Sequence, residues 1–390
     1  MRGKMKAALR TVAGVVIAVV LVIAALPFLN AAALILRAAG TPGPVGRIAR
    51  WEARAVVDSI ERIPTRDGSV RARVFKPSRR VRRAVVLVSG VHPDGIDEPR
   101  LVGLARDLAG TGVNVVTPEI RELMEYRLTA NVTNAIEDTA LWTAARDDLA
   151  GNAGIGMIGV SFSGGLSVVA AGRPALRDRV AYVLSFGGHG NLPRVLRYLC
   201  TGVEPARADG PGVRRPPHDY AVAVVLHQAA DLAVPPGQVD LLRRGIEAFL
   251  LASAAARTSQ QLAADITRAA RDLQARMPQP SATLMEYVIN RDVTSLGTRL
   301  LPYLDQLGQD PSLSPDQSRP PAAPVYLLHG SDDNVIPPVE SALLAAYLER
   351  FTKVRRLQSG FLSHVDVAER PRAGEIWQMV AFWKAALGEQ

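Results

Sequence analysis

The sequence predicts an α/β protein built on a mainly parallel sheet with a helical insertion. Short apolar runs alternate with helical stretches over the first half of the chain, and the alternation resumes at Pro324 after a mostly helical interval that begins beyond Phe186. The length of 390 residues exceeds one minimal domain. A content of 48% hydrophobic and 21% charged residues excludes a mostly disordered chain.

The amino-terminal end carries a long apolar segment. No charged residue occurs from Thr11 to Leu36, and this run is longer than the roughly 20 residues that cross a bilayer. It is also longer than the apolar core of a secretory signal, although small residues at 31–33 leave cleavage open as an alternative. We expect an uncleaved membrane anchor in residues 1–40 and a linker in 41–55, because Thr41–Gly46 is rich in proline and glycine.

The charges around this segment predict the side of the membrane. Four basic residues among the first ten favour a cytoplasmic amino terminus, which sends the rest of the chain across the membrane. Four arginines from Arg37 to Arg54 act in the opposite sense. We expect a single-pass membrane protein whose main domain lies outside the cytoplasm.

The formal net charge of +9 is dispersed along the chain. No zinc-finger spacing, RNA-binding signature or basic helix with heptads accompanies it, so we expect no nucleic-acid partner. The single cysteine, Cys200, excludes an internal disulfide and a cysteine-rich zinc site.

The first part of the core, residues 56–189, begins with a predicted hairpin. The strand-like runs Val56–Pro64 and Val70–Lys76 flank Arg66-Asp67-Gly68, in which the Asp-Gly pair tolerates the positive φ of a tight turn. Buried strands are then predicted at Ala84–Ser89, Val113–Thr117, Ile155–Val160 and Val180–Phe186, with crossover helices at Pro99–Ala109, Asn131–Leu149 and Gly164–Ala171.

Residues 190–321 are predicted to form a helical cap, after which the core resumes over 322–390. The clearest cap helix has five apolar residues on one face, which either pack within the protein or line an acyl-binding pocket: Val239, Leu242, Ile246, Phe249 and Leu250. The resumed core is predicted to contain strands at Pro324–Leu328 and Lys353–Leu357 and helices at Val339–Phe351 and Ala373–Leu387.

A serine lies where a predicted strand turns into a helix. The stretch Ile158–Gly165 reads IGVSFSGG and places Ser161 between Gly159 and Ser163. It resembles the nucleophile elbow of the α/β-hydrolase superfamily, in which small residues two positions before and after the serine let the chains approach closely. Ser163 stands where that pattern has glycine. The resemblance covers about residues 56–189 and 322–388 and implies an α/β-hydrolase fold.

A serine nucleophile requires a base and a carboxylate, which follow in the order Ser, Asp, His in this superfamily. The segment His329–Pro338 after a predicted strand resembles the acid loop, and by that resemblance Asp333 is the acid. His364 follows the last short strand, where the superfamily keeps its histidine. The resemblance therefore implies a catalytic triad of Ser161, Asp333 and His364.

A second stretch of the sequence is similar to the acid loop. Residues 226–236 echo it, with Asp231 in the place of Asp333. A triad through Asp231 would use His329, 98 residues away, as its base and would leave His364 without a role. We expect Asp231 to cap the helix that follows it.

The resemblance also implies two backbone N–H donors for the oxyanion of a tetrahedral intermediate, each worth on the order of 3 kcal/mol of barrier lowering. They are assigned to Phe162, after the serine, and to Val91, in the loop after the strand Ala84–Ser89. This second assignment departs from the superfamily pattern, because Ser89 replaces the usual histidine.

The other histidines have ordinary interpretations. His92 has only Asp94 and Asp97 near it in the sequence, which are too few potential ligands to indicate a metal site. We therefore expect no metal and no cofactor. His189 and His218 are expected to be structural or to line the cap.

Together these expectations describe a membrane-anchored serine hydrolase, an esterase that acts on a small-molecule ester or thioester through an acyl-enzyme. Two alternatives stay open. One is an acyltransferase on the same triad, in which an alcohol takes the acyl group. The other is an inactive, membrane-tethered binding protein. The acyl group, the leaving group and the oligomeric state are not predicted.

Overall fold

The computed structural model describes residues 25–38, 43–51, 55–152, 154–206, 210–256, 259–360 and 373–388, and an eight-stranded sheet lies at its centre. The strand order is β1-β2-β4-β3-β5-β6-β7-β8. The pairs β1–β2 and β2–β4 are antiparallel, and the other five pairs are parallel, which confirms the predicted sheet. The strands are β1 Val56–Thr65, β2 Gly68–Pro77, β3 Ala84–Val88, β4 Asn114–Pro118, β5 Ile155–Val160, β6 Val180–Phe186, β7 Val325–Gly330 and β8 Val354–Ser359.

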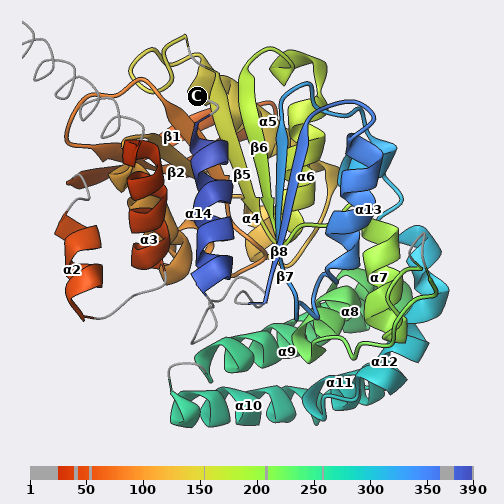
Figure 1. Cartoon of the computed structure of the whole chain (residues 1–390). Coiled ribbons are helices and arrows are strands. Elements are labelled where there is room, and N and C mark those ends of the chain that lie inside the picture. Colours follow the sequence, from red (N-terminus) through yellow and green to blue (C-terminus); the bar gives the residue numbers. More distant parts are fainter. Residues whose placement is uncertain are drawn as a thin grey trace, which may run out of the picture.

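Helices cover both faces of this sheet (Figure 1). One face packs against α5 (Ala130–Ala144), α6 (Phe162–Gly172) and α13 (Val339–Leu348), and the other against α3 (Pro99–Gly110), α14 (Ala373–Leu387) and a helix at residues 25–38. Side chains of a strand point alternately to the two faces. In β3, Val86 and Val88 accordingly join the first core, and Val85 and Leu87 join the second.

The predicted hairpin of β1 and β2 has a two-residue turn. Thr65 pairs with Gly68, so Arg66 and Asp67 form the turn. The positive φ falls on Gly68, at 122°, which accounts for glycine at this position.

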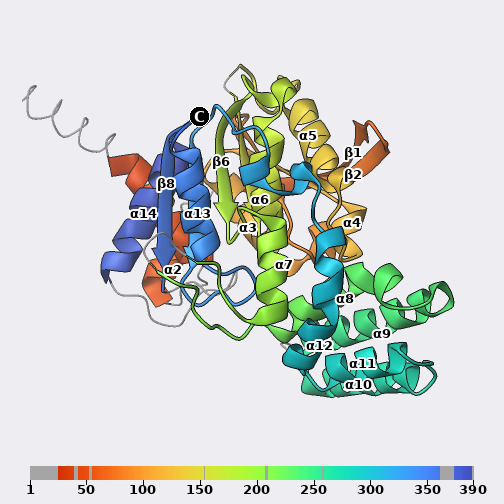
Figure 2. The ribbon, with the colours of Figure 1, turned by 90° about the vertical axis from the view of Figure 1, so that its right-hand side faces the viewer.

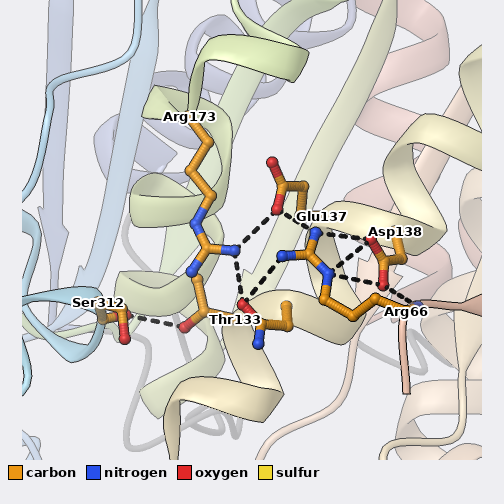
Figure 3. Close-up of polar contacts among 7 residues, drawn as sticks. Arg66, Thr133, Glu137, Asp138, Arg173 and Ser312 are labelled. Carbon is orange, nitrogen blue, oxygen red and sulfur yellow. Dashed lines mark hydrogen bonds and ion pairs between the residues drawn. The ribbon is translucent and has the colours of Figure 1, made fainter.

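An ionic network fixes this turn to α5 (Figure 3). Arg66 donates to Asp138 at 2.7 Å and also to Glu137, and Arg173, just beyond the end of α6, donates to Glu137 at 2.8 Å. The Glu137 side chain is only 8% exposed, so its charge depends on these two guanidinium groups. The hairpin is thereby held to the helices on one face of the sheet.

Between β6 and β7 the chain leaves the sheet and forms the predicted helical cap. Its helices are α7 Leu192–Thr201, α8 Asp219–Ala233, α9 Pro236–Ala255, α10 Gln260–Gln274, α11 Ser281–Ile289 and α12 Val293–Leu300. Helices α9 to α12 gather at one end of the molecule, at the bottom of both Figure 1 and Figure 2. The core contains two further short helices, α2 (Gly43–Trp51) and α4 (Arg121–Met124).

The start of the cap is fixed to the core by a buried carboxylate. Glu340 of α13 is fully buried and accepts the backbone N–H groups of Gly190 and Asn191 at 2.9 and 3.1 Å. Arg194 of α7 pairs with the same carboxylate at 2.6 Å. The chain therefore enters the cap from an anchored point.

The helix at residues 25–38 contains the last part of the segment predicted to be a membrane anchor. Its carboxyl-terminal half is buried in the domain, where Ala31 and Leu34 pack with residues of α3, α14 and the sheet. Arg37 is held by Asp107 of α3 at 3.0 Å. The end of the apolar run is thus part of the folded domain. Among the helices in the described ranges, none is long and apolar enough to span a membrane, and residues 11–24 lie outside these ranges.

Part of the predicted linker at 41–55 is helical, because α2 spans Gly43–Trp51. Pro44 lies in the first turn of α2, where the missing N–H of proline costs no helical hydrogen bond. The carbonyl oxygen of Ala49 accepts a hydrogen bond from Arg37 at 3.1 Å. The proline and glycine here mark the start of a helix packed near the domain.

Candidate active site

Ser161 occupies the sharp corner between β5 and α6. Its backbone has φ 58° and ψ −134°, a conformation that residues other than glycine rarely adopt. Such strain costs about 1–3 kcal/mol and persists only where the surroundings fix it. The Ser161 N–H donates to the carbonyl oxygen of Phe186 in β6 at 2.7 Å, and only 5% of the residue is exposed. The strand-to-helix corner predicted from the sequence is therefore present.

The positions flanking this serine are small for steric reasons. A Cβ on Gly159 would lie 2.2 Å from the carbonyl oxygen of Ser163 and 2.6 Å from Oγ of Ser167, so no side chain fits there. Ser163 replaces the glycine of the superfamily pattern, and its Oγ donates to the carbonyl oxygen of Ser89 at 2.5 Å. This bond ties α6 to the loop after β3, a role that the sequence does not reveal.

Asp333 lies in the loop after β7, where its carboxylate is buried and oriented. Only 1% of the residue is exposed. Oδ1 accepts the backbone N–H groups of Val335 and Ile336 at 2.9 and 3.0 Å, and Oδ2 lies 3.4 Å from Nε2 of His329. These contacts hold the acid in one orientation.

His329 is a buried neighbour of the acid, a role that the sequence interpretation did not assign to it. The residue is fully buried at the end of β7, and its Nε2 donates to the carbonyl oxygen of Ile336 at 2.8 Å. Its Nδ1 finds no partner within the part of the chain that the structure describes. The ring therefore bridges the two ends of the acid loop beside Asp333. The available signal was a histidine at the end of a buried strand, four residues before the acid.

The cap contacts the acid loop directly. The carbonyl oxygen of Asn334, next to the acid, accepts the backbone N–H of His218 at 2.9 Å and the hydroxyl of Tyr198 at 3.2 Å. The His218 side chain also accepts the N–H of Tyr220 at 3.3 Å and so caps α8. His218 therefore has the structural role expected from the sequence.

Ser161 and Asp333 follow the carboxyl ends of β5 and β7, two strands apart on one edge of the sheet. The backbone ladder continues beyond the strands, because the N–H of Gly187 donates to the carbonyl oxygen of Leu328 at 2.7 Å. Two strand spacings amount to about 10 Å. This gap suits an imidazole ring that bonds a hydroxyl on one side and a carboxylate on the other.

His364 lies outside the described residues, but the start of its segment is known. Ser359, the last residue of β8, pairs with Gly330 at the end of β7, and its carbonyl oxygen accepts the N–H of Ser331 at 3.0 Å. The chain is thus beside the acid loop five residues before His364. Five residues can extend to about 17 Å, which is enough to reach the space between Ser161 and the acid.

The loop after β3 lies beside Ser161. A Cβ on Gly90 would be 3.4 Å from Cβ of Ser161, and Val91 is half-buried against the core. Phe162 is the first residue of α6, and the first four N–H groups of a helix have no partner within it. The two predicted oxyanion donors therefore belong to segments that adjoin the serine.

Asp231 lies on the surface, and its predicted capping role is wrong. It is still inside α8, which ends at Ala233, and it forms an ion pair with Arg243 of α9. Pro235 precedes α9 and makes no side-chain cap bond. The sequence interpretation assigned a cap because aspartate is common just before a helix, and it did not anticipate that α8 extends to Ala233.

Two other reactive residues are buried in structural positions. His189 donates from Nε2 to the carbonyl oxygen of Leu313 at 2.8 Å, and burial lowers its pKa. Cys200 is buried, and this burial raises the pKa of its thiol to about 12, which disfavours the nucleophilic thiolate form. Within the described ranges, no group of three or more His, Cys, Asp or Glu residues is placed to hold a metal ion.

The apolar face of α9 is used for packing. All five of its predicted residues are at most 6% exposed and belong to one core with residues of α8 and α11, the helices that contact α9 along with α10. Of the two alternatives left open by the sequence, the structure favours packing over an acyl-binding pocket.

The mostly parallel eight-stranded sheet, with a serine corner after β5 and a cap after β6, is an α/β-hydrolase-like fold. No model of a protein family matches the sequence, and no curated protein matches it.

The structure is similar to several solved structures, including the following three. They are an esterase of Pyrobaculum calidifontis (19% identity, TM-score 0.44, 92% of this chain and 91% of that chain), the carboxylesterase EstE1 from a metagenomic library (16%, 0.44, 92% and 95%) and an acylaminoacyl peptidase of Pyrococcus horikoshii (13%, 0.45, 89% and 43%).

Proposed function

We propose that this protein is a serine hydrolase that cleaves carboxylic esters through an acyl-enzyme, with Ser161, His364 and Asp333 as its catalytic triad. The observation that carries the proposal is the strained backbone of Ser161 at a buried strand-to-helix corner. Strain of this kind is retained at functional sites, and it aims a serine hydroxyl away from its own strand. A fixed carboxylate two strands away supports the same interpretation.

In the proposed mechanism His364 takes the proton from Oγ of Ser161 as the oxygen attacks the ester carbonyl carbon. The N–H groups of Phe162 and Val91 stabilise the resulting oxyanion. The C–O bond to the alcohol then breaks, and His364 returns the proton to the departing oxygen. His364 takes a proton from water as the water oxygen attacks the acyl carbon. The bond to Oγ then breaks, His364 returns the proton to Oγ of Ser161, and the free acid leaves.

Asp333 accepts a hydrogen bond from the other ring nitrogen of His364 in this proposal, which fixes the productive tautomer. Oδ1 accepts the N–H groups of Val335 and Ile336, and the proposal assigns Oδ2 to the histidine. The buried ring of His329 supports the loop that presents this carboxylate.

The experiment is hydrolysis of p-nitrophenyl butyrate by the full chain and by Ser161→Ala. The variant should lose at least a thousandfold in kcat/KM. Ser167→Ala is the matched control, because Oγ of Ser167 is buried in the same helix and has no hydrogen-bond partner within the described ranges. Activity in Ser161→Ala equal to that of Ser167→Ala would refute the proposal.

We further propose that the uncharged residues before Ala25 attach the chain to a membrane and that the hydrolase domain lies outside the cytoplasm. The basic residues among the first ten support this orientation. A reporter fused after Gln390 should be active only on the extracytoplasmic side. Activity confined to the cytoplasmic side would reverse the orientation.

A further inference from the structure

The helix at residues 25–38 is exposed in one half and buried in the other. Leu26 and Leu29, three positions apart, are 47% and 51% exposed, whereas Ala31 and Leu34 are at most 1% exposed. Residues three apart lie on the same side of a helix. The amino-terminal half of the helix therefore extends away from the domain core and exposes apolar side chains on its surface.

An exposed tryptophan extends this apolar surface onto α14. Trp377 is 59% exposed, and its ring stacks parallel to Phe28 with 5.5 Å between centroids. Nζ of Lys384, also in α14, lies 4.9 Å from the centroid of Phe28. We give the name aromatic face to the exposed side chains of Leu26, Leu29 and Trp377 together with the half-buried Phe28 on which Trp377 stacks. Tryptophan at the level of lipid headgroups, with a lysine whose stem covers apolar surface, is typical of membrane–water interfaces.

The length of the uncharged run identifies the occupant of this face. The stretch from residue 11 to residue 30 contains 20 residues without a charge, and burial in the domain begins at Ala31. About 20 apolar residues are what a bilayer core requires. The uncharged run continues to Leu36, and its first 20 residues end where burial in the domain begins. Helix α2 occupies part of the stretch in which a linker was expected.

We propose that the aromatic face lies in the lipid–water interface of a bilayer, so that the domain is seated directly on the membrane without an intervening linker. This rests on the proposed attachment of the amino-terminal end and adds which surface faces the lipid. Helix α10 of the cap lies far from α14 in both Figure 1 and Figure 2. A second copy of the chain or residues 1–24 folded back would be the competing occupants.

The test places an environment-sensitive NBD label at Trp377→Cys in the full chain, reconstituted in vesicles of phosphatidylcholine and phosphatidylglycerol. The native cysteine interferes little, because Cys200 is buried. Leu262→Cys in α10 is the matched control, since Leu262 is also about half exposed, at 49%, and lies in the cap. Lipids with a nitroxide near the headgroup should quench the label at 377 at least threefold more than the label at 262.

Each other outcome identifies what is wrong. A chain that fails to float with the vesicles overturns the membrane attachment itself. A chain that floats but shows equal quenching at both positions would overturn only the placement of the aromatic face in the lipid–water interface. Energy transfer between copies labelled at 377 without lipid quenching assigns the face to a dimer. A blue-shifted but unquenched label at 377 in dilute chains assigns it to residues 1–24.

Discussion

Replacing Asp333 by asparagine removes one charge and leaves the shape of the acid loop. The amide oxygen can still accept the N–H groups of Val335 and Ile336, now at 2.9 and 3.0 Å from Oδ1, so we expect little loss of stability. An amide NH₂ then replaces Oδ2, the oxygen assigned to His364, and it favours the wrong tautomer of the imidazole. A fall of about 10⁴ in kcat, or about 5.4 kcal/mol in barrier, is expected.

The assay is p-nitrophenyl butyrate hydrolysis at saturating ester, with thermal unfolding of the same samples. Asp231→Asn is the matched control, because Asp231 has a surface ion pair with Arg243 and no contact with the acid loop is expected of it. Its activity should stay within twofold. A loss below tenfold in a folded Asp333→Asn, or a larger loss in Asp231→Asn, would refute the assignment of the acid.

Three further predictions concern the scaffold. Gly159→Ala should cost about 1–3 kcal/mol of unfolding free energy and at least tenfold in kcat/KM, since its Cβ would meet the carbonyl oxygen of Ser163; unchanged values contradict the steric reading. Arg66→Ala should cost about 1–2 kcal/mol in urea unfolding, against less than about 0.5 for Arg127→Ala, whose pair with Glu125 is exposed on both sides. Burial lowers the pKa of His189 in the folded chain, so below about pH 6.5 the unfolded chain binds more protons at this histidine than the folded chain does. The free energy of unfolding should therefore decrease as the pH is lowered, by up to about 1.4 kcal/mol per pH unit. In His189→Gln the side-chain amide can still donate to the carbonyl oxygen of Leu313, and the decrease in stability between pH 7.5 and pH 5.5 should be smaller in thermal melts. The same pH dependence in the variant and the wild type would show that other groups cause it.

Much of the fold could be predicted because strand burial and turn chemistry are local. All eight strands begin and end within two residues of their predicted bounds, and the central strands β3 to β7 are mostly buried. The corner at Ser161 was predicted from its resemblance to the nucleophile elbow, in which small residues flank the serine.

The parts that could not be predicted depend on contacts between distant segments. The apolar residues after Ala25 have the composition of a membrane anchor, and only the position of α3 and α14 shows that half of them pack on the domain. The bond from Ser163 to Ser89 joins residues 74 positions apart. The ring of His329 acts across its own loop to Ile336, a contact that no periodicity signals.

The identity of the nucleophile is tested most directly by covalent labelling. The full chain is treated with a serine-directed fluorophosphonate, digested and analysed by tandem mass spectrometry. We expect a single adduct on Ser161, abolished in Ser161→Ala, because the hydroxyl of Ser163 donates a hydrogen bond to the carbonyl oxygen of Ser89. An adduct on Ser163, or on any residue when Ser161 is absent, would contradict it.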